Sequence, residues 1–400
     1  MVSEPESSWG TSDMGKPEES EERVVGVFWH GFPETWSPVY THTLRMMKGV
    51  AGRRGRLVFL TNKKDLSEPS EELTEDIHVK RTEFLLRRTT RFPGKFILFL
   101  KWVLLFQLGE IRRCKMVYVR DLLFSTLAIC KLLGKPLVLE KNDVDEAAPH
   151  AQRNWMGQLT HRLRFRALDF VDIIIVQTDE SKTAHQRMGI PSRKLVVVPN
   201  GVDTNLFSFS ERPIPHNVRL LYVAHLDENK SLDITMTVAK DMHGEVELTV
   251  VGDGPRKAEF ENEAKELGLK NVTFVGSVPH DELPRMMSDH DFGIGEYDLD
   301  YKEFRDYGFF FFPLKILECL SCGRPVFVNA SNAVIRELER SGVVFGFQRK
   351  EDVIRTLNSL RLSSQKVLET QRKARRIALK YDWERAVDTL LEKLDSRGIL

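Results

Sequence analysis

The stretch Pro313-Leu-Lys-Ile-Leu-Glu-Cys-Leu-Ser-Cys-Gly-Arg-Pro-Val326 has the features of a short helix followed by a buried strand. Pro313 suits the first helical position because its ring fixes φ and it lacks the N–H that a first turn leaves unpaired. The glycine and proline near the end of the stretch stop the helix before the strand at residues 326–328. Lys315 and Glu318 are three residues apart, so they share one face near the helix start.

This helix start has two interpretations. Free amides, a partial positive charge and Lys315 together form a site suited to phosphate, and Glu318 one turn later can accept hydrogen bonds from sugar hydroxyls. The alternative is a solvated Lys–Glu pair on an ordinary surface helix. These residues alone leave both interpretations open.

Four further motifs precede this helix along the chain. They are Val196-Val-Val-Pro-Asn-Gly-Val-Asp203, Tyr222-Val-Ala-His-Leu-Asp-Glu-Asn-Lys-Ser-Leu-Asp233, Val250-Val-Gly-Asp-Gly-Pro255 and Asn271-Val-Thr-Phe-Val-Gly276. The succession resembles the retaining, nucleotide-sugar-dependent glycosyltransferases of family 4, from about Val24 to the C-terminus and most strongly across residues 195–330. The resemblance implies the GT-B fold, an α/β architecture in which two Rossmann-like domains face each other across a cleft.

Composition agrees with a soluble α/β protein. Four hundred residues are enough for two such domains, and 59 basic against 58 acidic residues give no excess charge that would favour a nucleic-acid partner. Four unevenly spaced cysteines predict no disulfide framework, which favours a reducing, cytoplasmic compartment. The pair Cys319 and Cys322 has metal or redox spacing, but no second Cys/His pair accompanies it.

Apolar runs of strand length alternate with helical segments, which predicts parallel sheets covered on both faces. We expect a disordered acidic tail at residues 1–22, an acceptor-side Rossmann-like domain at 23–207, a nucleotide-sugar-binding Rossmann-like domain at 218–380, and a helix at 381–400 that crosses back to the first domain. The predicted strands lie at residues 24–28, 56–60, 116–119, 136–140, 172–177, 194–198, 218–223, 247–251, 272–275, 292–294 and 325–329.

The resemblance also implies a donor site on the second domain. A diphosphate leaving group needs cations or helix N-termini, because negative charge builds on it as the glycosidic bond breaks. Lys230 matches the family's phosphate-binding lysine, and His225 stands where relatives have an arginine. We therefore assign Lys230, Lys315 and Glu318 to catalysis and donor binding and add His225 to the donor site. The alternative for His225 is a partly buried polar residue at a strand end.

Three further positions complete the implied donor site, and one position departs from the family pattern. Gly276 belongs to the segment whose backbone contacts the base in relatives, while Pro313 and Leu314 bring helix amides to the phosphates. Relatives usually carry a first glutamate eight positions before Glu318, but this chain has Phe310 there. It resembles a branch with an aromatic run before Pro-Leu-Lys and no first glutamate.

The acceptor side is less distinct. His30 and Gly31 occupy the place of the family's first glycine-rich loop, and Asn142 stands near the position of a histidine found in many relatives. A same-face retaining reaction needs no base there, since the leaving phosphate can take the acceptor proton. Asp298-Leu-Asp300 has the form of a metal–diphosphate motif, but a solvated loop is the favoured interpretation, and we expect neither metal nor cofactor beyond the donor.

Residues 80–115 suggest a membrane face. They carry ten basic against two acidic residues around the apolar segment 96–108, which is too short to span a bilayer. Basic flanks around an aromatic apolar helix suit an anionic membrane surface. The alternative is a core helix with a solvated basic rim.

Taken together, the residues and the resemblance predict a metal-independent glycosyltransferase of the hexosyltransferase type. We expect it to act on a lipid-linked saccharide or growing glycan, in the cytoplasm or at the cytoplasmic face of a membrane. The rival from another class is a non-catalytic GT-B protein that binds a ligand or partner, which the substitutions at His225, Phe310 and Asn142 favour. An epimerase or phosphorylase of the same fold ranks third.

Overall fold

The computed structural model describes residues 23–27, 38–54, 57–61, 77–81, 108–120, 124–141, 144, 162–163 and 165–400. Side chains are described from residue 45 onward, except in the strands at 57–61 and 77–81. Several predictions lie outside these residues: the acidic tail at 1–22, the acceptor-side residues His30, Gly31 and Asn142, and most of the proposed membrane face, residues 82–107.

The first sheet has seven parallel strands in the order β3-β2-β1-β4-β5-β6-β7. The strands are β1 (Arg23–Val27), β2 (Leu57–Thr61), β3 (Ile77–Arg81), β4 (Cys114–Val119), β5 (Leu137–Glu140), β6 (Ile173–Val176) and β7 (Leu195–Val197). The helices are α1 (Pro38–Arg54), α3 (Leu108–Arg112), α4 (Phe124–Leu133), α6 (Asp179–Arg187) and the 3₁₀ turns η5 (Leu168–Phe170) and η6 (Ser192–Lys194). Every residue of β5 and β6 is buried, as expected for a parallel sheet covered on both faces.

The second sheet has six parallel strands in the order β10-β9-β8-β11-β12-β13. The strands are β8 (Val218–Val223), β9 (Val246–Val251), β10 (Val272–Gly276), β11 (Phe292–Gly295), β12 (Val326–Val328) and β13 (Val344–Gly346). The helices are α7 (Asp233–Asp241), α8 (Lys257–Glu266), α9 (Leu283–Asp289), α10 (Lys302–Tyr307), α11 (Leu314–Ser321), α12 (Ala333–Arg340), α13 (Lys350–Arg361) and α14 (Ser364–Ala378). The predicted α/β class with two parallel sheets is confirmed.

Both sheets reverse their strand order at one point. The first sheet switches between β1 and β4, and the second between β8 and β11. In open parallel sheets, ligands bind beyond the carboxyl ends of the strands at such a switch point. The loop after β8 and the segment after β11 are therefore the places to look for a site on the second sheet.

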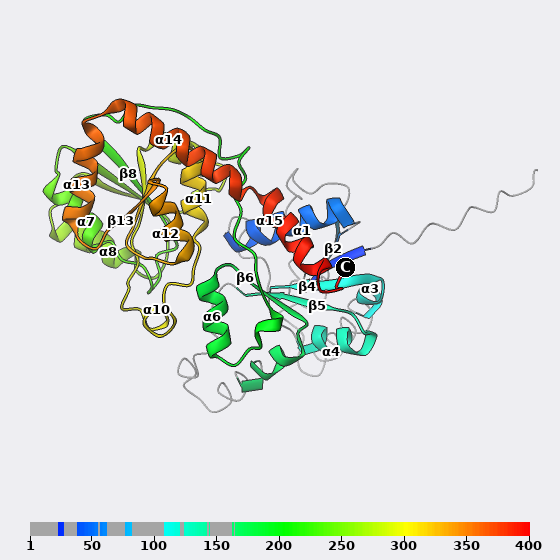
Figure 1. Ribbon diagram of the computed structural model, residues 1–400. Helices are drawn as coiled ribbons and strands as arrows, with labels where there is room; N and C mark the ends of the chain where they lie inside the picture. The colour runs from blue at the N-terminus through cyan, green and yellow to red at the C-terminus, as the bar shows by residue number, and fades with distance from the viewer. Residues whose placement is uncertain are drawn as a thin grey trace, which may run out of the picture.

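The C-terminal helix α15 (Trp383–Asp395) follows α14 and the 3₁₀ turn η7 (Leu379–Tyr381), and it lies along α1 of the first unit (Figure 1). A Cβ on Gly49 of α1 would lie 2.3 Å from Val387, so only glycine permits this close approach. Arg53 pairs with Asp388 at 3.0 Å across the same contact. Apolar residues of both helices share one core with the first sheet, among them Met46, Met47, Val50, Leu390 and Leu394.

Two strands and one helix boundary differ from the sequence-based expectations. β3 and β13 are not predicted, because β3 alternates apolar with charged residues and β13 has three residues. Pro313 is the N-cap of α11 in an extended conformation, with φ −65° and ψ 127°, so the helix begins one residue later than predicted. Among the described residues, no helix has both the length and the apolar character needed to cross a bilayer.

Candidate functional site

Two lysines and two tyrosines meet where β8 and β11 end. Lys230, in the loop after β8, forms an isolated antiparallel bridge with Tyr297, just beyond β11. The Lys230 ammonium lies 3.0 Å from a carboxylate oxygen of Asp227 and 5.4 Å from the centre of the Tyr297 ring. Burial lowers the pKa of Lys230, and the neighbouring Asp227 carboxylate partly opposes that effect.

Lys315 reaches the same place from the first turn of α11. Its ammonium lies 4.7 Å from the centre of the Tyr222 ring and 5.2 Å from that of Tyr297. Burial, with a smaller contribution from the positive charge of Lys230, lowers the pKa of Lys315 to about 7. Within the described part of the chain this buried ammonium has no hydrogen-bond partner. An anion bound there would supply the missing acceptors.

The start of α11, which carries Lys315, has no side-chain cap within the described chain. Its N-cap is Pro313, whose side chain cannot accept a hydrogen bond from the first-turn amides, and no other side chain in the described residues caps the helix. The helix ends in a left-handed glycine, Gly323 with φ +79°, whose N–H donates to the Leu320 carbonyl at 3.0 Å. The N-terminus of α11 therefore keeps its unpaired amides and its partial positive charge.

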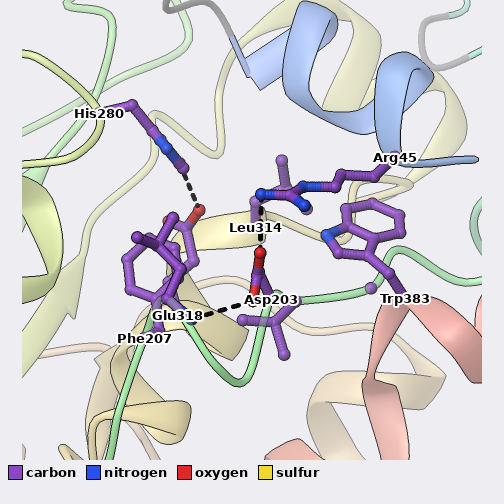
Figure 2. Close-up of a pocket in the computed structure, with 10 residues that line it drawn as sticks. Arg45, Asp203, Phe207, His280, Leu314, Glu318 and Trp383 are labelled. Atoms are coloured by element: carbon purple, nitrogen blue, oxygen red, sulfur yellow. Dashed lines mark hydrogen bonds and ion pairs between the residues drawn. The ribbon is translucent and has the colours of Figure 1, made fainter. Parts of the chain in front are cut away.

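Glu318 faces a different group of residues, shown in Figure 2. The Glu318 side chain is buried, and one of its carboxylate oxygens lies 3.3 Å from Nε2 of His280. It lines a small pocket that opens to solvent. The other lining residues come from α1, the connection between the two units, the loop after β10, α11 and α15: Arg45, Gly201, Val202, Asp203, Leu206, Phe207, His280, Leu314 and Trp383. Arg45 of α1 pairs with Asp203 at 2.7 Å inside this pocket.

Glu296, which directly follows β11, is a buried helix cap. It lies two residues before the Asp298-Leu-Asp300 segment for which the sequence favours a solvated loop, yet its exposed fraction is 1%. Its carboxylate accepts from the backbone amides of Ile234 and Thr235 at 3.0 and 2.8 Å and from the Thr235 hydroxyl at 2.7 Å. Glu296 thereby caps the N-terminus of α7 and fixes the end of the loop that carries Lys230.

Asp298 and Asp300 form a local turn. An oxygen of the Asp298 carboxylate accepts from the Asp300 amide at 2.9 Å, which is an Asx-turn. In the part of the chain that is described, no group of three His, Cys, Asp or Glu side chains is placed to hold a metal ion.

The glycine loop after β9 is a structural support. Gly252 has φ +132°, and a Cβ there would lie 1.7 Å from the carbonyl oxygen of Ala224. The Gly252 N–H donates to the carbonyl of Gly276 at 2.8 Å, and Gly276 itself has φ +82°. The loop thus packs backbone against the segment that carries His225. His225 is exposed, and its side chain makes no hydrogen bond within the described residues.

The aromatic run before α11 joins the two units. The hydroxyl of Thr178, at the start of α6, donates to the Phe310 carbonyl at 2.8 Å, and the Asn200 amide donates to the Phe312 carbonyl at 2.6 Å. The Phe310 ring is buried and packs against Phe311, with ring centres 4.5 Å apart. The side chain that replaces the family's first glutamate therefore lies in the aromatic core and not on the surface of the site.

The first unit places a buried polar network at the ends of β4 and β5. The carboxylate of Glu140 accepts from the Tyr118 hydroxyl at 2.6 Å and from Arg120 at 3.0 Å. The sequence does not single out these residues, because a Glu at a strand end and an Arg twenty positions earlier give no motif.

The structure thus brings Lys230 and Lys315 together and places Leu314 and Glu318 in the pocket shown in Figure 2. No sequence motif predicts that His280, Tyr222 or Tyr297 belongs to the site. Tyr222 lies within an apolar strand, where an aromatic residue predicts packing, and His280 becomes part of the site only through the fold.

Comparisons with known proteins identify the family. The model for "Glycosyl transferases group 1" matches residues 206–378, and the model for "Glycosyltransferase Family 4" matches residues 39–206. The crystal structure of Anabaena Alr3699/HepE in complex with UDP and glucose is similar to the chain with a TM-score of 0.69 and 18% identity, covering 94% of this chain and 100% of that one. This similarity shows the GT-B fold. The chain belongs to the family 4 glycosyltransferases, a retaining family that uses nucleotide-sugar donors.

Two curated relatives match over parts of their length. A subunit of the phosphatidylinositol N-acetylglucosaminyltransferase of Arabidopsis thaliana is 24% identical over 56% of this chain and 48% of its own length. O-antigen chain mannosyltransferase C of Escherichia coli is 27% identical over 30% of this chain and 34% of its own length. The chain therefore aligns with about half, or less, of the length of these relatives.

Proposed function

We propose that the chain transfers a hexosyl group from a UDP-sugar to a hydroxyl acceptor, with retention of anomeric configuration. The observation that carries this proposal is the buried ammonium of Lys315, which has no hydrogen-bond partner among the described residues, beside the partly buried ammonium of Lys230. Two cations at the carboxyl edge of a parallel sheet, next to an uncapped helix N-terminus, suit a diphosphate.

Each donor-site residue takes a stated role in this proposal. Lys230 and Lys315 bind the diphosphate, and the amides after Pro313, beginning with that of Leu314, contribute hydrogen bonds to it. Glu318 accepts hydrogen bonds from the ribose hydroxyls. His225 donates to phosphate from the loop after β8, and the backbone at Gly276 borders the base.

The reaction breaks the bond between the anomeric carbon and the diphosphate oxygen, and it forms a bond from that carbon to the acceptor oxygen. The acceptor proton passes to the leaving phosphate on the same face, so the products are a glycoside and UDP. The two ammonium groups stabilise the charge that develops on the leaving oxygen, which is where a transition state of this kind needs it. A metal ion is not required for this role.

The similar proteins support a donor base and a class of acceptor. HepE has been crystallised in complex with UDP-glucose, which supports UDP as the nucleotide. The names of the two curated relatives specify phosphatidylinositol and an O-antigen chain, which supports a lipid-linked or glycan acceptor. An acceptor of this kind agrees with the proposed membrane face at residues 80–115, and with a peripheral position on the cytoplasmic side of a membrane.

A second candidate is a non-catalytic GT-B protein. The burial of Phe310 at the position of the family's first glutamate favours it, since no carboxylate then contacts the transferred sugar from that position. The two candidates differ in turnover, because a binding protein would retain the nucleotide affinity without releasing sugar.

Thermal shift and turnover with UDP-, GDP- and ADP-sugars test the proposal. We expect UDP-sugars to stabilise the wild-type protein and to be turned over in the presence of membrane lipid extract. The Lys230→Met and Glu318→Ala variants should lose both the stabilisation by UDP-sugars and the turnover. The control variant Lys265→Met, which changes an exposed lysine of α8, should keep both. Stabilisation without turnover would favour the binding protein, and no stabilisation by any nucleotide sugar would refute the proposed donor site.

A further inference from the structure

The carboxylate of Glu318 is hydrogen-bonded to a residue outside its own helix. Glu318 lies in the second turn of α11 with 8% of its surface exposed. In the described part of the chain, the side chain that hydrogen-bonds to its carboxylate is that of His280, with Nε2 and Oε1 3.3 Å apart. A carboxylate only accepts hydrogen bonds, so the shared proton belongs to Nε2 of the imidazole.

The imidazole of His280 is itself fixed in place. His280 lies in the loop between β10 and α9, where its carbonyl accepts from the Leu283 amide at 3.3 Å. Its ring meets that of Phe207 edge to face, with centres 5.5 Å apart and an interplanar angle of 75°. Phe207 is fully buried, and its carbonyl accepts from the Ser321 hydroxyl of α11 at 2.6 Å. The imidazole thus lies between α11 and the connection that joins the two units (Figure 2).

This geometry leaves part of the carboxylate available. An ionised carboxylate has about four acceptor positions, and His280 uses one of them. The remaining positions border the pocket, which opens to solvent. A pair of neighbouring hydroxyls, such as the 2′ and 3′ hydroxyls of a ribose, presents two donors and matches such a carboxylate.

We propose that His280 is a positioning residue for the ribose of the donor nucleotide. Its Nε2–H holds Glu318 in the rotamer that accepts from the two ribose hydroxyls, a role that rests on the proposed function of the site. Without that hydrogen bond, the Glu318 side chain would regain rotamer freedom and have to lose it on binding, which is expected to weaken nucleotide binding about tenfold. Contacts to the diphosphate would be unchanged, because they come from other residues.

The test compares two substitutions with two ligands by isothermal titration. His280→Phe keeps an aromatic ring against Phe207 but removes the donor, whereas His280→Gln keeps an N–H donor near the position of Nε2. The ligands are UDP and 2′,3′-dideoxy-UDP, which lacks both ribose hydroxyls. We expect His280→Phe to weaken UDP binding about tenfold and to change dideoxy-UDP binding less than twofold, and we expect His280→Gln to recover most of the UDP affinity. In turnover, KM for the donor should rise while kcat changes little.

Three outcomes separate the possible failures. Equal weakening of both ligands by His280→Phe would show a structural role and overturn the proposal. Unchanged UDP binding by that variant would also overturn it while leaving the donor site intact. If the wild-type protein binds neither UDP nor GDP nor ADP, the proposed function fails, and the role of His280 fails with it.

Discussion

Replacing Lys315 by Met should stabilise the protein in the absence of donor. Methionine keeps most of the apolar stem that packs near Tyr222 and Tyr297 and removes the buried charge. The native structure gives that charge no hydrogen-bond acceptor among the described residues and places a second ammonium nearby. The buried ammonium therefore destabilises the native state, and an anionic ligand bound beside it would remove that destabilisation.

The size and pH dependence of this effect follow from the depressed pKa. Burial lowers the pKa of Lys315 from 10.5 to about 7, so between these values the unfolded chain binds a proton that the native chain has lost. The wild-type stability must then rise with pH across this window. Linkage gives a cost of about 4 kcal/mol at pH 7 and about 2 kcal/mol at pH 9, and Lys315→Met abolishes it. The advantage of the variant should accordingly shrink by about 2 kcal/mol between the two pH values.

Urea denaturation at pH 7 and pH 9, without nucleotide, measures this difference. The control is Lys265→Met, an exposed lysine of α8, which should show no comparable pH-dependent gain. A further measurement adds UDP, which should stabilise the wild-type protein and not the Lys315→Met variant. If the variant is no more stable than the wild type at pH 7, or if its advantage is the same at pH 9, the burial argument for Lys315 is wrong.

Three further substitutions test the surroundings of the site by urea denaturation. Gly252→Ala should cost at least about 3 kcal/mol, because its Cβ would overlap a carbonyl in a left-handed backbone, whereas Gly244→Ala, with φ +82° and open space, should cost only about 1 kcal/mol. Glu296→Gln should cost about 2–4 kcal/mol, since an amide nitrogen would face buried donors at the start of α7, and a loss below about 1 kcal/mol would contradict the capping role. Arg375→Met should cost about 2–4 kcal/mol, because its guanidinium joins three carbonyls of α11 and the inter-unit connection, while the exposed Arg376→Met should be close to neutral.

Much of the fold could be predicted from local patterns because several of the described strands are fully buried. The apolar runs at residues 137–140 and 173–176 have no polar face, so their length and flanking turns identify them as strands of a parallel sheet. The strand at 77–81 alternates apolar with basic residues, and the strand at 344–346 is too short for any period to show. These two edge strands depend on pairing with their neighbours, which local sequence does not reveal.

The candidate site was predictable where a residue lies within a motif. Lys230 and Lys315 belong to motifs after a strand and at a helix start, so the sequence predicts that both serve one site. Glu296 and His280 lie in segments whose composition suggests a solvated loop. Glu296 becomes a buried cap because β11 ends beside α7, and His280 meets Glu318 because the loop after β10 lies beside α11. Such pairings arise from the order of strands in the sheet.

The aromatic run shows how this chain can depart from the family pattern and still keep the proposed donor site. The Thr178 hydroxyl joins the two units by donating to the backbone carbonyl of Phe310. This hydrogen bond does not depend on which side chain residue 310 carries. The phenylalanine ring adds burial among its aromatic neighbours, so this position stabilises the joint between the units instead of contacting ligand. Lys315 shows the opposite behaviour, because its ammonium costs stability and makes no hydrogen bond within the described chain. If residue 315 only joined the two units, methionine there would make the fold more stable than lysine does. An anion bound at the ammonium, such as a diphosphate, explains why this position holds a lysine.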